Sequence, residues 1–278
     1  MRRLPKPEIS AGIVFNLCID SITDPNLKMR LCRSRHIVEA AEAVYITQAE
    51  LTALHSIPDT NGIGGIVTNA EMKRVYNGTF VRSVSTRDIY GALKSAPEND
   101  ICPLCSQRAV SQLDHYLPKS RHSSLVVTPV NLVPACGECN KVKLDLQVTQ
   151  AEDQTFHPYF EDADDARWLY ARVEQSNGGA LVFFAQPPNE WSNIKKQRIA
   201  VHFKTYKLAN LYASHSAVEL KDMQFGLRQM KLRNSPQEIS NHLRKVAESR
   251  AAAHDNSWRR AAYEALADSV WFCEGGFD

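Results

Sequence analysis

Two cysteine pairs place the strongest constraint on how this chain can fold. Each pair has two residues between its cysteines, and 30 residues separate Cys102-Pro103-Leu104-Cys105 from Cys136-Gly137-Glu138-Cys139. A turn of this kind lets two thiolates meet one metal ion, and two such turns complete a tetrahedral set of four ligands. Four thiolates saturate zinc and leave no open position. We therefore predict a structural zinc ion that holds together a segment with little core of its own.

An alternative interpretation makes one of the pairs a redox dithiol. Thioredoxin-like motifs do not come as two matched pairs, so the spacing favours zinc. The three other cysteines stand alone in the sequence, at Cys18, Cys32 and Cys273.

Length and composition are those of an ordinary globular protein. The chain has 278 residues, of which 44% are apolar and 23% charged, enough for one large domain or two smaller ones. No apolar run approaches the roughly 20 residues that a membrane helix needs. The basic N-terminus lacks the apolar stretch of a signal peptide. We expect a cytoplasmic protein.

Apolar residues at helical spacing predict an α+β protein that is mostly α. Residues 1–97 are expected to form a helical region, 98–150 a small metal-stapled unit, and 151–278 a hairpin followed by helices. The expected N-terminal helices span 8–22, 26–55 and 87–95, with a further helix after a capping box at Thr68 and Glu71.

The C-terminal region is expected to begin with a hairpin. Its strands would cover 168–173 and 180–184, joined at Asn177-Gly178-Gly179. Helices are expected to start near Trp191, Ala209 and Ser235, the one at Ser235 with a capping box formed by Ser235 and Glu238, and a last one to span 257–272. The segment His157-Pro158-Tyr159-Phe160 mixes a possible ligand with aromatic residues, and we expect it to pack against the metal-stapled unit.

Charge is spread unevenly, although the formal net charge is only +2. Residues 195–260 contain 14 Lys and Arg against 5 Asp and Glu, whereas 152–174 contain 7 acidic and 2 basic residues. Such asymmetry permits a nucleic-acid surface on the C-terminal region. Solvated helix faces would give the same pattern, and the sequence leaves both interpretations open.

Residues that suit phosphodiester hydrolysis lie between the cysteine pairs and just after them. Asp114 precedes His115, Asn131 lies in Asn131-Leu132-Val133-Pro134, and Asn140 directly follows Cys139. A histidine can take a proton near neutral pH, and an aspartate is a hard oxygen ligand of the kind that magnesium prefers. Neighbours on a strand point to opposite faces, so Asp114 and His115 must lie at a bend or a strand end to serve one site.

In this order and spacing, the segment resembles the HNH (ββα-metal) endonuclease family. The resemblance covers about 45 residues. It implies that His115 is the general base and that Asp114 and Asn140 hold a catalytic metal. It also implies that Asn131 orients the base. The family more often has histidine at the position of Asn140; an amide oxygen here favours magnesium, with manganese as a substitute.

Basic residues around the motif are candidate contacts to nucleic acid. They are Lys119, Arg121, Lys141 and Lys143. Each feature also has a structural interpretation taken alone: Asp114-His115 as a turn, Asn131 as a loop closure, Asn140 as a helix cap, and the basic residues as solvated side chains. Because all of these features occur together within the zinc framework, the structural interpretations would require four separate coincidences. We therefore favour the catalytic site.

The resemblance implies a magnesium-dependent endonuclease that acts on duplex DNA and leaves 5′-phosphate ends. Chains of this style resemble the nuclease subunit that is paired with an ATPase in Septu-type antiphage defence systems. The sequence contains no GxxxxGK[ST] motif, so any ATP dependence would require an ATPase partner. The alternative function is a zinc-stabilised module that binds nucleic acid or a partner protein without catalysis.

Overall fold

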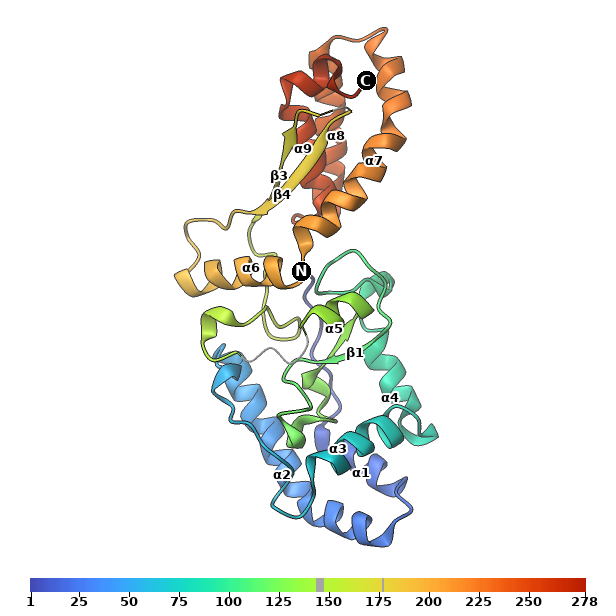
Figure 1. Cartoon of the computed structure of the whole chain (residues 1–278), viewed down its shortest axis with the longest axis vertical. Coiled ribbons are helices and arrows are strands. Elements are labelled where there is room, and N and C mark those ends of the chain that lie inside the picture. Colours follow the sequence, from blue (N-terminus) through green and yellow to red (C-terminus); the bar gives the residue numbers. More distant parts are fainter. Residues whose placement is uncertain (144–147, 177) are drawn as a thin grey trace. The chain divides into compact units, whose positions relative to one another are not determined.

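A computed structural model describes residues 1–143, 148–176 and 178–278 (Figure 1). It is mostly helical with two small antiparallel sheets among these residues, which confirms the predicted α+β class. The chain forms two compact units, Met1–Asp162 and Ala163–Asp278. The three-part division at 97/98 and 150/151 stays a prediction. No helix of the described residues has the length and apolarity that a bilayer span requires.

The first unit begins with two helices whose starts follow from their caps. In α1 (Ala11–Asp20) the Ser10 side chain accepts from the third helical amide, and in α2 (Pro25–Glu50) Asp24 caps a helix with Pro25 at its first position. The predicted helix over 26–55 extends too far. It ends at Glu50 because Thr52 adopts a left-handed conformation, with φ of 55°.

Next come α3 (Asn69–Arg74) and a π-helix, η2 (Val75–Phe80), followed by α4 (Val84–Lys94). The predicted capping box of Thr68 and Glu71 is present at the start of α3. Helix α4 begins three residues earlier than predicted because Ser83 caps it. Short 3-10 turns, including Leu54–Ser56 and Glu98–Asp100, connect these elements.

The segment between the cysteine pairs folds as two strands and a helix. Strand β1 (Gln112–His115) pairs antiparallel with β2 (Leu132–Ala135), and α5 (Gly137–Lys143) follows directly. Two 3-10 turns, Ser123–Leu125 and Pro129–Asn131, lie in the loop between the strands. Both strands contact α4, and the buried Leu113 and Leu132 belong to the same apolar core as α1 and α2. This small ββα segment therefore shares one core with the N-terminal helices.

A cluster of aromatic side chains packs against β2. The His157 side chain is 1% exposed; its Nε2 lies 2.9 Å from Tyr45 Oη, and its Nδ1 accepts from the Tyr159 amide at 3.2 Å. The Tyr159 hydroxyl donates to the Leu132 carbonyl at 2.9 Å. His157 is thus buried, and its segment contacts the ββα segment through Tyr159 and Leu132. The short η6 (Ala151–Asp153) precedes this cluster.

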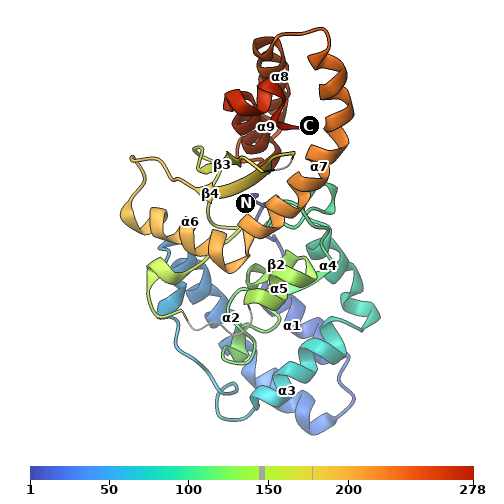
Figure 2. The same cartoon turned by 45° about the horizontal axis from the view of Figure 1, so that its top comes forward.

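The second unit contains the predicted hairpin and four long helices (Figure 2). Strand β3 (Leu169–Glu174) pairs with β4 (Ala180–Ala185), and Asn177 of the predicted turn lies outside the described residues. The capping box at Ser235 is present at the start of α8, as predicted. The helices are α6 (Asn193–Thr205), α7 (Leu208–Lys231), α8 (Pro236–Ala253) and α9 (Trp258–Asp268), with a last π-turn, η7 (Phe272–Gly276).

Candidate active site

The four paired cysteines meet in one buried cluster. Their sulfur atoms all lie within 4.8 Å of one another, and none forms a disulfide. Zinc–sulfur bonds of about 2.3 Å place tetrahedral sulfurs about 3.8 Å apart, so this cluster needs only a small contraction. Backbone amides point at two of the sulfurs, from Arg108 to Cys105 at 3.5 Å and from Cys139 to Cys136 at 3.4 Å. The cluster can therefore hold a metal ion such as zinc.

Each cysteine pair sits where an element of the ββα segment begins or ends. Cys102 and Cys105 lie in a tight turn closed by a bridge between Ile101 and Ala109, just before β1. Cys136 follows the last residue of β2, and Cys139 lies in the first turn of α5. A metal ion at this point ties both strands and the helix together.

One pocket of about 750 Å³ lies beside this cluster and collects most of the predicted site residues. Asp114 and His115, the last two residues of β1, line it together with Asn140 on α5. Lys119 and Lys141 line it as well. Both residues lie at the end of the strand, and the chain bends directly after His115, as a shared site for two neighbouring residues requires.

Asn140 occupies the middle of α5, three residues after the helix begins at Gly137. This position excludes the helix-cap interpretation of its side chain, since a cap residue must flank the helix. Asn140 lines the same pocket as Asp114 and His115. An amide and a carboxylate side chain are a donor set that suits a hard divalent cation.

His115 is held in a defined orientation. Its Nε2 lies 2.9 Å from the carbonyl oxygen of Val126, and its ring makes an edge contact with Tyr76 at 4.5 Å between centroids. A carbonyl only accepts hydrogen bonds, so Nε2 carries the proton and the lone pair of the neutral ring lies on Nδ1. Burial lowers the pKa of His115 to about 3, which keeps the ring neutral at ordinary pH.

Lys143 contacts Asp114 and is not among the residues that line the pocket. Its Nζ is 3.1 Å from Asp114 Oδ2 and donates to the His115 carbonyl at 2.8 Å, and the residue is only 8% exposed. Burial raises the pKa of Asp114, and the Lys143 ammonium opposes this shift. The sequence suggested Lys143 as a phosphate contact, but the structure places it where it neutralises and positions Asp114.

Asn131 holds the loop that follows His115 in place through side-chain hydrogen bonds. It is fully buried; its Oδ1 accepts from the Leu117 amide at 2.7 Å, and its Nδ2 donates to the carbonyls of Leu117 at 3.1 Å and Leu125 at 3.2 Å. The loop-closing interpretation and an orienting role for Asn131 both fit these contacts, because the clamped loop is the one that carries the chain away from His115.

Two of the basic residues that were predicted to contact nucleic acid, Lys119 and Lys141, line the pocket, whereas Arg121 does not. Lys119 lines the pocket, with its Nζ 4.7 Å from the centroid of the Tyr76 ring and 3.4 Å from Asn77 Oδ1, and Lys141 is an exposed pocket residue. Arg121 is not among the residues that line the pocket. Its guanidinium binds the Asp59 carboxylate, with Nε 2.8 Å from Oδ2.

The N-terminal helices supply part of the pocket wall, and the sequence did not predict this part. Tyr76, Asn77 and Val81 come from η2 and the turn after it, and Tyr90 comes from α4. These residues lie more than 20 positions before Asp114 and form no motif with it. The π-helix is the available structural signal, because such irregular turns occur frequently at functional sites.

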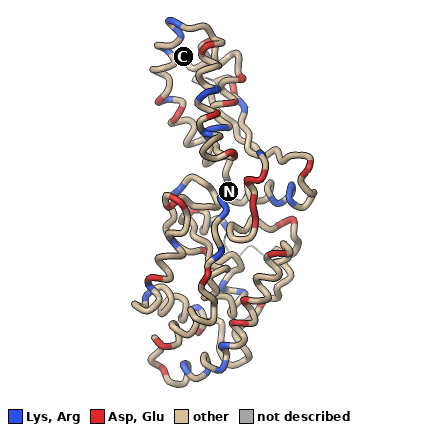
Figure 3. The backbone as a smooth tube through the Cα atoms, turned by 180° about the vertical axis from the view of Figure 1, so that it is seen from behind, with Lys and Arg blue, Asp and Glu red and all other residues tan. Residues whose placement is uncertain are grey.

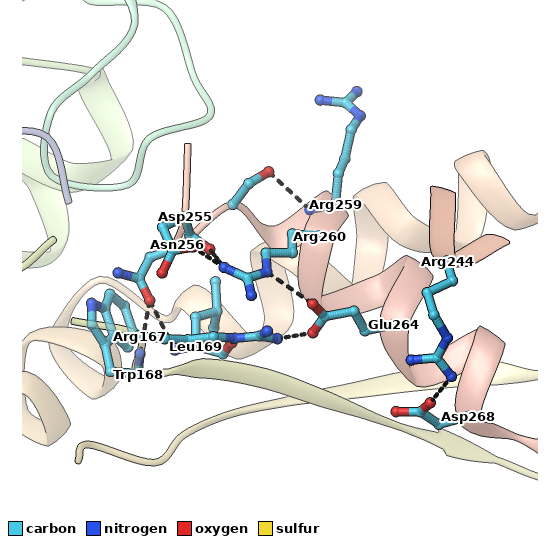
Figure 4. Close-up of polar contacts among 11 residues, drawn as sticks. Arg167, Trp168, Leu169, Arg244, Asp255, Asn256, Arg259, Arg260, Glu264 and Asp268 are labelled. Atoms are coloured by element: carbon cyan, nitrogen blue, oxygen red, sulfur yellow. Dashed lines mark hydrogen bonds and ion pairs between the residues drawn. The ribbon is translucent and has the colours of Figure 1, made fainter. Parts of the chain in front are cut away.

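Several basic residues of the second unit pair with acidic side chains. Figure 4 shows Arg167 and Arg260 sharing Glu264, Arg260 also reaching Asp255, and Arg244 bound to Asp268. Arg228 and Lys231 bind Asp278 in the same way. Blue and red segments accordingly alternate along this unit in Figure 3. The charge asymmetry counted along the sequence is thus partly reduced by Glu264, Asp268 and Asp278, which lie outside the counted segment.

Comparisons with known proteins give one distant relative. Protein ea31 of Escherichia phage lambda is 24% identical over an alignment that covers 99% of this chain and all of that protein. The name of that protein states no activity. No protein-family model matches the chain, and no solved structure matches it.

Proposed function

We propose that this protein is a magnesium-dependent endonuclease of the HNH type, stabilised by zinc at the four-cysteine cluster. The observation that carries the proposal is the meeting of Asp114, His115 and Asn140 in one pocket, on two strands and a helix whose ends converge on that cluster. A binding module has no need of a neutral, oriented histidine beside two hard oxygen donors.

In this proposal His115 takes a proton from the attacking water through Nδ1. The bond from Nε2 to Val126 fixes the tautomer, and burial lowers the pKa of His115, which keeps the ring uncharged with its lone pair on Nδ1. Asp114 and Asn140 would hold magnesium, which supplies charge neutralisation at the phosphate when bound. Lys119 and Lys141, at the pocket wall, would bind phosphate oxygens.

Lys143 opposes protonation of Asp114 and holds its carboxylate in place. An isolated carboxylate buried beside an apolar strand would tend to take up a proton, and the ammonium at 3.1 Å opposes this. DNA as the substrate, 5′-phosphate products and a defence role with an ATPase partner follow from the resemblance alone and stay predictions.

Substitutions at Asn140 test the metal site with little risk to the fold, because Asn140 is half-buried within a helix. We expect Asn140→Ala to raise the magnesium concentration for half-maximal plasmid cleavage by roughly tenfold or more, the size of a lost ligand. Asn140→Asp is the matched control and should keep or lower that concentration, since a carboxylate is a stronger hard ligand.

The measurement is a magnesium titration of cleavage by the three proteins at equal zinc content. Equal magnesium requirements for wild type and Asn140→Ala would remove Asn140 from the metal site. Absence of cleavage of DNA and RNA by the wild type with magnesium or manganese would favour the non-catalytic binding module.

A further inference from the structure

The pocket continues onto a basic face of α4. Tyr90 lines the pocket, and Arg87 and Lys94 lie three residues before and four residues after it, so all three share one side of the helix. Arg82 directly follows the pocket residue Val81. We refer to Arg82, Arg87, Tyr90 and Lys94 as the α4 strip. Figures 1 and 2 show α4 beside the ββα segment, where it contacts β1 and β2.

The cations of the α4 strip lack acidic partners among the described residues. No described acidic side chain forms an ion pair with Arg82, Arg87 or Lys94, in contrast to the neutralised arginines of the second unit. The acid nearest in the helix, Asp88, lies roughly 160° around the axis from Tyr90, at about 100° per residue. The strip therefore presents uncompensated positive charge next to the pocket.

A glycine in the middle of α4 leaves the helix surface open beside the strip. Gly91 lies four residues after Arg87, on the same side of the helix, and a Cβ built there would meet no atom within 4 Å. Packing thus does not require glycine, although glycine in a helix interior costs about 1 kcal/mol relative to alanine. Its absent side chain lets another backbone approach the helix closely.

We infer that the α4 strip binds the phosphate backbone of the nucleic acid whose scissile phosphate lies in the pocket. The inference rests on the proposed function. Arg87 and Lys94 are about 10 Å apart along a helix that rises 1.5 Å per residue, which is far enough for each to contact a different phosphate. The strip would contact phosphates and no bases, so it contributes affinity and position without sequence preference.

The test is the salt dependence of DNA binding by the full chain. Zinc-loaded His115→Ala protein, which should not cut, is titrated onto a labelled duplex at several salt concentrations, with and without Arg87→Ala/Lys94→Ala. Each lost phosphate contact lowers the slope of log K against log[salt] by about 0.9, so the pair should lower it by about 1.8. Arg87 is exposed and Lys94 is half-buried, and alanine favours helix, so thermal melting close to that of the parent protein is expected.

Lys221→Ala/Lys245→Ala is the matched control, since both lysines are exposed on helices of the second unit. It should leave the slope unchanged. An unchanged slope in Arg87→Ala/Lys94→Ala, or an equal loss in the control pair, would overturn the α4 strip and leave the proposed function standing. If the parent protein bound no DNA at any salt concentration, both the strip and the proposed function would fail.

Discussion

Serine in place of Cys136 is expected to remove the bound zinc and to unfold the ββα segment. The four sulfurs join the start of β1, the end of β2 and the start of α5, and the strands are only four residues long. Apparent binding free energies of structural zinc are on the order of 10 kcal/mol, comparable with the whole stability of a typical domain. We expect zinc content to fall from about one per chain to a small fraction, with a lower melting temperature.

Cys32→Ser is the control for this substitution, because Cys32 is exposed on α2 and lies outside the cluster. It should keep full zinc content and the wild-type melting temperature. Limited proteolysis should cut Cys136→Ser, and chelator-treated wild type, within residues 101–143. Wild-type stability in protein shown to contain no zinc would refute the structural role of the cluster.

Alanine in place of His115 should lower the rate of DNA cleavage by about 10² to 10⁴, the usual contribution of a positioned general base. Zinc content should not change, because the cysteine cluster remains. The substitution leaves the Val126 carbonyl without its donor, which costs about 1 to 3 kcal/mol, so melting curves must show that the variant is folded at the assay temperature.

His122→Ala is the matched control for His115→Ala. His122 is buried in the same loop, but it is not among the residues that line the pocket. Its variant should therefore cleave at close to the wild-type rate once corrected for folded fraction. A similar loss of cleavage in both variants would point to loop instability and not to a catalytic role of His115.

Local signals explain which parts of the fold and site the sequence could predict. The cysteine spacing, the capping boxes at Thr68 and Ser235 and the glycine-rich hairpin act within a few residues, and each appears where it was expected. The end of α2 was missed because nothing in the sequence marks Thr52 as left-handed.

The tertiary features of the site could not be predicted in the same way. Lys143 follows Asn140 by three residues in the same helix. Asn140 lines the pocket, whereas Lys143 contacts Asp114, and this difference depends on how α5 packs against β1. Tyr76 and Tyr90 belong to helices far from the motif, and their position depends on how the shared core is assembled.

The central claim is that this pocket performs metal-dependent hydrolysis of DNA. The most direct measurement is the fate of supercoiled plasmid incubated with zinc-loaded wild-type protein in magnesium, compared with the same protein in EDTA and with His115→Ala in magnesium. We predict nicked or linear product only from wild type in magnesium. Equal cleavage by wild type and His115→Ala, or intact plasmid in every reaction that contains magnesium, would contradict the claim.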